Sequence, residues 1–314
     1  MTKKRKRRLN VQHLLIVLLI LLCILTAIMG GGYLLYKVIF GGSKPIVADV
    51  YDPSLPLKMR VDISTDKYLL SRLTPEGNYI VYANREDEKI YPASLTKLMT
   101  LKVATDYITD YDEMMRVHYL DLEGLLENDA SVLGLQVNDE ISLLNILYGL
   151  ILPSGSDCAN MIDRYFALND LDLLTLMNQT AQELGMKSTH FSNTTGLYDE
   201  NNYTTLSDLN LLGVSLMENQ TARTILETYY REDDGFIFRS TARNYETRFT
   251  EGSSKILGGK TGFIPESGYN YFAIIKDAQG QISLLFLSDC KSQSEDERNP
   301  HLQDALKILN YYFD

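Results

Sequence analysis

The chain has 314 residues, enough for one domain of about 200 residues with accessory segments, and its 45% of hydrophobic residues can form a packed core. Its formal net charge of −11 at pH 7 argues against a nucleic-acid-binding protein, which would present a basic surface. The cysteines Cys23, Cys158 and Cys290 are scattered. Cys158 and Cys290 could pair outside the cell, but their spacing does not require it, and we expect buried free thiols.

The N-terminal segment combines a basic start with a long apolar run. Residues 1–12 include KKRKRR, and residues 13–40 are mostly apolar, which is about the length of a membrane span. A cleaved signal peptide has the same order, but its apolar part is only about 7–15 residues long. We therefore favour a transmembrane anchor with a cytoplasmic N-terminus, by the positive-inside rule. Residues 41–60, with several Gly and Pro, are predicted to be a linker.

Residues 61–314 form the predicted folded domain, and their pattern changes from strands to helices and back. Two strands joined by a Pro-Gly turn are expected over residues 67–73 and 79–84. After a helix that begins near Ser94 and a polar connection, helices are expected over residues 141–152, 157–167, 171–184, 205–217 (capped by Thr204 or Ser207) and 221–230. Strands over residues 236–239, 256–260, 269–276 and 281–289 and a closing helix over 301–313 complete the pattern. This order predicts an α/β (α+β) domain with an antiparallel sheet flanked by helices.

The run from Tyr91 to Thr100 places a serine and a lysine three residues apart at the start of an apolar helix. Pro92 precedes the run, where a helix entry tolerates proline. Positions i and i+3 share one face of a helix, so Lys97 is expected beside Ser94. A serine hydroxyl becomes a good nucleophile only when a base takes its proton, and a lysine with a lowered pKa can be that base.

Two further motifs follow in the chain. Ser154-Gly155-Ser156 comes after an apolar run, and Lys260-Thr261-Gly262 comes after two glycines. Each motif alone is weak. S-x-x-K, an S-x-N-type triplet and K-T-G, in this chain order, occur in penicillin-binding proteins and class A β-lactamases.

With these motifs the chain resembles the D-alanyl-D-alanine carboxypeptidases, the low-molecular-mass penicillin-binding serine peptidases. The matching segments are PASLTK (92–97), LPSG (152–155), FSNTTGL (191–197) and GKTGF (259–263). The resemblance covers roughly residues 60–290 and implies a β-lactamase/DD-peptidase-like fold. In that fold an all-helical subdomain is inserted into the sheet domain, and the active site lies between the two.

The resemblance also implies roles for individual residues. Ser94 would form an acyl-enzyme with a D-Ala carbonyl, Lys97 would take the Ser94 proton, and Ser154 would relay a proton to the leaving group. Lys260 and Thr261 suit the terminal carboxylate of the peptide or of a β-lactam. Gly262 would let the substrate backbone come close, and the N–H groups of Ser94 and Phe263 would form the oxyanion hole.

Ser156 departs from the family pattern, which usually has Asn at this position. Serine is shorter and lacks the paired carbonyl and NH₂ groups of an amide, so its contact with the substrate amide is in question. Asn193 and Gly196 are expected to shape a loop rather than to react.

The resemblance therefore predicts a serine-type D-Ala-D-Ala carboxypeptidase on the outer face of a bacterial cell membrane. Its partners would be peptidoglycan stems ending in D-Ala-D-Ala, β-lactams and the membrane, with no nucleic acid. The four histidines have no metal-ligand spacing, so neither a metal nor another cofactor is expected.

Two alternatives remain open. A β-lactamase would need rapid deacylation through a glutamate-held water, and Glu183 and Glu200 lack the matching surroundings. A wall-peptide-binding module without turnover is favoured only by Ser156.

Overall fold

The computed structural model describes residues 61–242, 254–292 and 299–313. The predicted basic segment, anchor and linker, residues 1–12, 13–40 and 41–60, lie outside these residues, as does Cys23. Among the helices that the structure does describe, we find none with the length and apolar character needed to cross a membrane.

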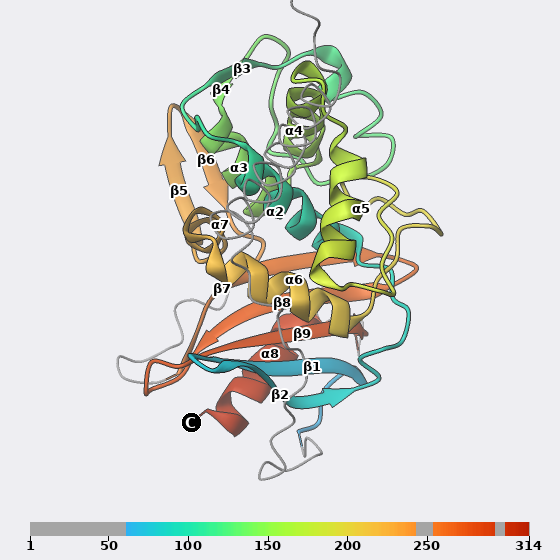
Figure 1. The fold of residues 1–314 in the computed structure, drawn as a ribbon, viewed down its shortest axis with the longest axis vertical. Helices are drawn as coiled ribbons and strands as arrows, with labels where there is room; N and C mark the ends of the chain where they lie inside the picture. The colour runs from blue at the N-terminus through green and yellow to red at the C-terminus, as the bar shows by residue number, and fades with distance from the viewer. Residues whose placement is uncertain (1–60, 243–253, 293–298, 314) are drawn as a thin grey trace, which may run out of the picture. The chain divides into compact units, whose positions relative to one another are not determined.

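A five-stranded antiparallel sheet forms one half of the domain (Figure 1). Its strands, in the spatial order β2-β1-β9-β8-β7, are β2 (Gly77–Asn84), β1 (Lys67–Thr74), β9 (Ile282–Cys290), β8 (Gly268–Lys276) and β7 (Lys255–Ile264). Strands β1 and β2 form the predicted hairpin. Strands β7, β8 and β9 form an antiparallel meander, and β9 also pairs with β1. Strand β7, which carries the K-T-G motif, is therefore an edge strand.

Helices cover both faces of the sheet. Helix α6 (Leu206–Glu218) contacts β1 and β9 on one face, and helix α8 (Pro300–Tyr312) contacts β8 and β9 on the other. Successive strand residues point to opposite faces, so a strand that is covered on both faces has a continuous apolar sequence. This explains the apolar runs of β8 and β9: Leu285 packs in the α8 cluster, whereas Phe286 lies against Gly213 of α6.

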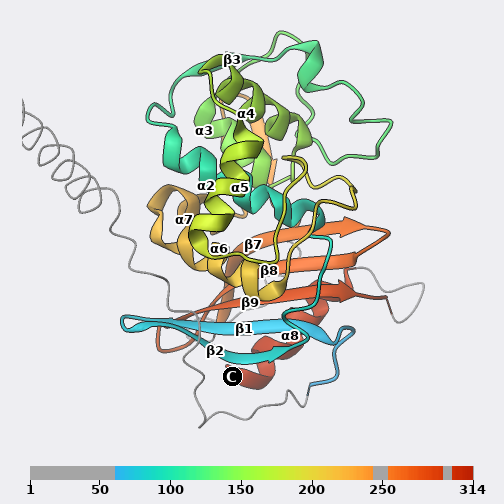
Figure 2. The ribbon, with the colours of Figure 1, turned by 45° about the vertical axis from the view of Figure 1, so that its right-hand side comes forward.

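The other half of the domain is mainly helical and surrounds helix α2. It contains η1 (Ala93–Leu95), α2 (Thr96–Tyr107), η2 (Tyr119–Asp121), α3 (Leu143–Ile151), α4 (Ser156–Leu168), α5 (Leu173–Leu184) and α7 (Gln220–Leu226). It also contains two small two-stranded sheets, β3 (Met114–Arg116) with β4 (Glu140–Ser142) and β5 (Tyr230–Asp233) with β6 (Phe236–Arg239). Helix α2 contacts α3, α4, α5, α6 and α7 and is buried along most of its length. Figure 2 shows β7 as the strand of the sheet nearest this helical half.

The predicted antiparallel sheet flanked by helices is confirmed, and the differences lie at element ends and in the short strands β3, β4 and β5, which were not predicted. The helix expected over residues 221–230 ends at Leu226, because Tyr230 pairs with Arg239 in a hairpin that the sequence did not reveal. The predicted caps Thr204 and Ser207 are wrong: the side chain of Thr205 accepts the N–H of Asp208. Cys158 and Cys290 are buried free thiols, as expected.

Phe286 offers a test of the α6 face. Its side chain is fully buried and stacks on Phe272 with ring centroids 4.8 Å apart. We expect Phe286→Ala to lower the free energy of unfolding by about 3–5 kcal/mol, since it opens a cavity beneath α6. Ile237→Ala, at a side chain that is 46% exposed, is the control and should change it by less than about 0.5 kcal/mol. Equal losses in denaturant titrations of both variants would contradict this packing.

Candidate active site

Ser94 lies in η1, the short turn that leads directly into α2, and this turn rests against the edge strand β7. Ala93 has a φ of 49°, in the left-handed region that L-residues rarely adopt. A Cβ atom at Gly262 would lie 3.0 Å from the Ser94 backbone nitrogen. Only glycine therefore lets β7 approach the Ser94 backbone this closely without displacing it.

Lys97 is the partner of Ser94 in the structure. Its Nζ atom lies 3.2 Å from Ser94 Oγ, and the side chain is only 1% exposed. Burial lowers the pKa of Lys97 to about 7, and the nearby Asp157 opposes that shift. Burial thus gives Lys97 the lowered pKa that a base requires, and near neutral pH a substantial fraction of Lys97 is an uncharged amine.

The second hydrogen bond of Lys97 is with a backbone carbonyl. Its Nζ donates to the carbonyl oxygen of Thr195 at 2.5 Å. Thr195 belongs to the FSNTTGL segment, and Gly196 follows it with a φ of 82°. A Cβ atom at Gly196 would lie 2.0 Å from the Ala93 carbonyl oxygen, so this loop fits against the Ser94 turn only with glycine there. The loop-shaping role expected for Gly196 agrees with this geometry.

Ser154 and Lys260 come from opposite halves of the domain and meet at the site. Lys260 Nζ donates to Ser154 Oγ at 2.7 Å and to the Thr261 carbonyl at 2.7 Å. Burial lowers the pKa of Lys260 well below its usual range, and repulsion by Lys97 adds to the effect. Ser154 has a φ of 65°, so strained backbone holds this hydroxyl as well. Lys260, which the resemblance assigns to the substrate carboxylate, is thus already hydrogen-bonded to Ser154 in this structure.

Ser156 is the first residue of α4 and is 2% exposed. Its backbone N–H donates to the carbonyl of Ser131 at 2.8 Å, which joins the start of α4 to the preceding connection. The structure therefore places Ser156 in the same short loop as Ser154.

Asp157 is a buried carboxylate whose importance the sequence did not reveal. Its oxygens accept the backbone N–H groups of Leu133, Gly134, Leu135 and Cys158 at 2.9–3.3 Å. These bonds hold the 133–135 segment against the start of α4. An acid in the first turn of a helix following a Ser-Gly-Ser turn was the available signal.

Thr241 is a second residue that sequence reasoning missed. Its hydroxyl is hydrogen-bonded to the hydroxyl of Thr261, and its N–H donates to the Leu152 carbonyl at 3.0 Å. Thr241 thus connects the edge strand to the chain just before Ser154. Phe263, two residues beyond Thr261, is 53% exposed and packs on Tyr269.

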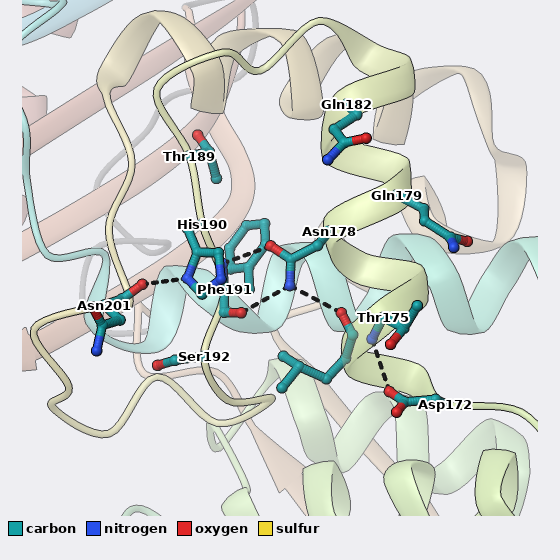
Figure 3. A pocket seen from close by; sticks show the side chains of 11 residues that line it. Asp172, Thr175, Asn178, Gln179, Gln182, Thr189, His190, Phe191, Ser192 and Asn201 are labelled. Carbon is teal, nitrogen blue, oxygen red and sulfur yellow. Dashed lines mark hydrogen bonds between the residues drawn. The ribbon is translucent and has the colours of Figure 1, made fainter.

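A separate groove of about 710 Å³ lies between α5 and the segment around residues 189–201 (Figure 3). None of Ser94, Lys97, Ser154 and Lys260 lines it. His190 at its wall bonds the Asn201 carbonyl at 2.7 Å. Over the described ranges, no three His, Cys, Asp or Glu side chains gather in a way that could hold a metal ion.

Comparisons with known proteins agree with this geometry. The family model described as D-alanyl-D-alanine carboxypeptidase matches residues 58–289. The D-alanyl-D-alanine carboxypeptidase of Streptomyces sp. strain K15 is 29% identical over 74% of this chain and 82% of its own length. DacF of Bacillus subtilis is 26% identical over 74% of this chain, and DacC of Escherichia coli is 29% identical over 69%. The chain spans 59% and 53% of the lengths of these last two relatives.

Solved structures show the same relationship. The crystal structure of the Streptomyces K15 DD-transpeptidase superposes with a TM-score of 0.70 at 25% identity, over 81% of this chain and 98% of that one. A D-alanyl-D-alanine carboxypeptidase from Mycobacterium tuberculosis, at 17% identity and a TM-score of 0.67, covers 85% of this chain and 97% of its own, and shares the fold. From the family match over residues 58–289 and the arrangement of Ser94, Lys97, Ser154 and Lys260, this chain belongs to the D-alanyl-D-alanine carboxypeptidase family of serine peptidases.

Proposed function

We propose that the protein is a serine-type D-Ala-D-Ala carboxypeptidase that removes the terminal D-alanine from peptidoglycan pentapeptide stems. The observation that carries the proposal is the buried Lys97 amine, 3.2 Å from Ser94 Oγ and with a pKa near 7, in a chain of this family. β-Lactams, which imitate the D-Ala-D-Ala end, would acylate the same serine.

In the first step Ser94 Oγ attacks the carbonyl carbon of the penultimate D-Ala while Lys97 accepts the hydroxyl proton. The Thr195 carbonyl lies 2.5 Å from Lys97 Nζ, where it stabilises the ammonium that forms. Negative charge develops on the substrate oxygen, and the backbone N–H groups of Ser94 and Phe263 are the proposed donors to it.

The tetrahedral intermediate then collapses, and the C–N bond to the terminal D-alanine breaks. The leaving nitrogen needs a proton, and Ser154 is proposed to deliver it while taking up the proton that Lys97 accepted from Ser94, which leaves Lys97 neutral again; Lys260 Nζ, 2.7 Å from Ser154 Oγ, holds that hydroxyl in place. Water next attacks the Ser94 ester, with Lys97 as base, which releases the shortened peptide and restores the serine. An amine attacking instead of water would give transpeptidation by the same acyl-enzyme.

The terminal carboxylate of the substrate is proposed to meet the hydroxyls of Thr261 and its neighbour Thr241. Lys260 is held beside them by its bonds to Ser154 and the Thr261 carbonyl, and adds positive charge when it is protonated. Ser156 is proposed to contact the substrate amide in place of the usual Asn, with one hydroxyl where the family has an amide.

We further propose that residues 13–40 anchor the protein in a bacterial cell membrane, with residues 1–12 in the cytoplasm and 61–314 outside. The basic start, the length of the apolar run and the extracytoplasmic location of peptidoglycan stems support this topology.

The carboxypeptidase proposal is tested with full-length protein in detergent and a peptide ending in D-Ala-D-Ala. We expect release of free D-alanine that Ser94→Ala abolishes, because the variant lacks the attacking oxygen. Labelling of wild-type Ser94 by a fluorescent penicillin without D-alanine release would support the binding-module alternative. Rapid, repeated hydrolysis of the penicillin would instead indicate a β-lactamase.

The pH dependence of acylation tests the role of Lys97. Because its pKa is lowered to about 7, Lys97 becomes protonated as the pH falls through that value and can no longer accept the Ser94 proton. The rate of labelling by a fluorescent penicillin should therefore decline below about pH 7. Lys97→Arg keeps a cation but has no accessible neutral form, and should lower the rate at least about a hundredfold at every pH. A rate independent of pH between 5 and 9 would contradict Lys97 as the base.

The membrane topology is tested by adding a protease to intact spheroplasts. We expect the catalytic domain to be digested while a tag fused to the N-terminus remains protected, since only the latter would be cytoplasmic. Recovery of the whole protein in the soluble fraction, without a membrane-bound form, would contradict the anchor.

A further inference from the structure

We propose that Asn193 is a positioning residue for acylation: its side chain fixes the peptide unit whose carbonyl holds Lys97 against Ser94. This inference rests on the proposed function and assigns a role to a residue that touches neither Ser94 nor Lys97 in the hydrogen bonds of the site.

The first step of the argument is the geometry that a lysine base requires. An uncharged amine has two N–H bonds and one lone pair, and the lone pair must face the Ser94 hydroxyl to receive its proton. An acceptor elsewhere around the nitrogen occupies one N–H bond and so orients the amine. The Thr195 carbonyl, 2.5 Å from Lys97 Nζ, is such an acceptor.

The second step is what holds that carbonyl. The C=O of Thr195 and the N–H of Gly196 belong to the same planar peptide unit, so fixing one group fixes the direction of the other. Asn193 Oδ1 accepts the Gly196 N–H at 2.7 Å. The peptide unit is thus held at one end by Asn193 and at the other by Lys97.

Asn193 makes further contacts around the same unit. Its Oδ1 also accepts the backbone N–H and the hydroxyl of Thr195, each at 3.2 Å, and its Nδ2 donates to the Leu197 carbonyl at 3.1 Å. The loop is anchored to α2 one residue earlier, where the Thr194 carbonyl accepts the hydroxyl of Thr100 at 2.8 Å. One amide side chain therefore organises the turn from residue 193 to residue 197.

Other groups that act on Lys97 come from different elements and remain in place when Asn193 is changed. Electrostatic interaction with Asp157 and Cys158 of α4 raises the pKa of Lys97, and repulsion between Lys97 and Lys260 of β7 lowers the pKa of Lys260. Ser94 faces it from η1. A change in the pH profile of an Asn193 variant can therefore be assigned to the Thr195 carbonyl.

A second asparagine, Asn178 of helix α5, bonds to the same loop and provides a matched control. Asn178 Oδ1 accepts the Phe191 N–H at 2.9 Å, and its Nδ2 donates to the carbonyls of Phe191 and Leu174 at 2.8 and 3.0 Å (Figure 3). It holds the start of the loop by the same kind of bonds but does not reach the 195–196 peptide unit. Asn178→Ala thus removes comparable bonds without releasing the carbonyl.

The experiment measures penicillin labelling and D-alanine release against pH for the full-length wild type, Asn193→Ala and Asn178→Ala, with melting temperatures. We expect Asn193→Ala to lower the labelling rate about tenfold or more above pH 8, which corresponds to the loss of about one hydrogen bond to a charged group. The acidic limb of its pH profile, the range over which the labelling rate falls as the pH is lowered, should move to lower pH, because a lost acceptor disfavours the ammonium form of Lys97. Asn178→Ala should keep the labelling rate and the acidic limb of the wild type, even if its melting temperature is lower.

Asn193→Asp provides a second variant in case Asn193→Ala does not fold. It keeps the accepting oxygen for the Gly196 N–H, so the rate above pH 8 should return towards that of the wild type. Equal rates and limbs for Asn193→Ala and Asn178→Ala, or a limb moved to higher pH in Asn193→Ala, would overturn the proposal. A wild type that is neither labelled nor active would refute the proposed function instead, which keeps the two failures distinct.

Discussion

Lys97 is a side chain built to carry charge, yet only 1% of its surface is exposed, in the first turn of a helix that neighbouring helices surround. Removing an ammonium group from water is costly, and the cost appears here as a pKa lowered to about 7. The same burial applies to Lys260, so two amines share a small volume with Ser94 and Ser154. Burial therefore converts a weak nucleophile and a normally protonated amine into a reactive pair.

The surrounding backbone shows how closely the elements must meet for this burial. Ala93 and Ser154 both adopt left-handed backbone conformations, and each lies where the helical half meets its neighbour. Gly196 lets a loop approach the Ser94 turn to a distance that a Cβ atom would prevent, and a Cβ atom at Gly262 of the edge strand would crowd the same turn. Strain and close approach are thus concentrated around one serine, as expected of a preorganised site.

Much of this arrangement follows from sequence. Alternation and helical spacing predict the sheet, its flanking helices and most of their bounds, and the motif spacing identifies Ser94, Lys97, Ser154 and Lys260. The Thr195 carbonyl was not predictable, because a backbone acceptor has no side-chain signature. Thr241 and Asp157 were missed because the partners that tie them to other segments lie at least 20 residues away in the chain. The β5–β6 hairpin was missed because its first strand, Tyr230–Asp233, is short and polar.

The contacts that activate Ser94 join distant parts of the chain. Lys97 meets Thr195 across 98 residues, and Ser154 meets Lys260 across 106. Such loops close late in folding, because their entropy loss precedes any compensating contact. A nascent chain whose strand β7 has not yet left the ribosome contains Ser94 and Lys97. It lacks Lys260 and the strand that packs against the Ser94 turn. The arrangement that makes Ser94 reactive is therefore complete only when the last strands of the fold are in place.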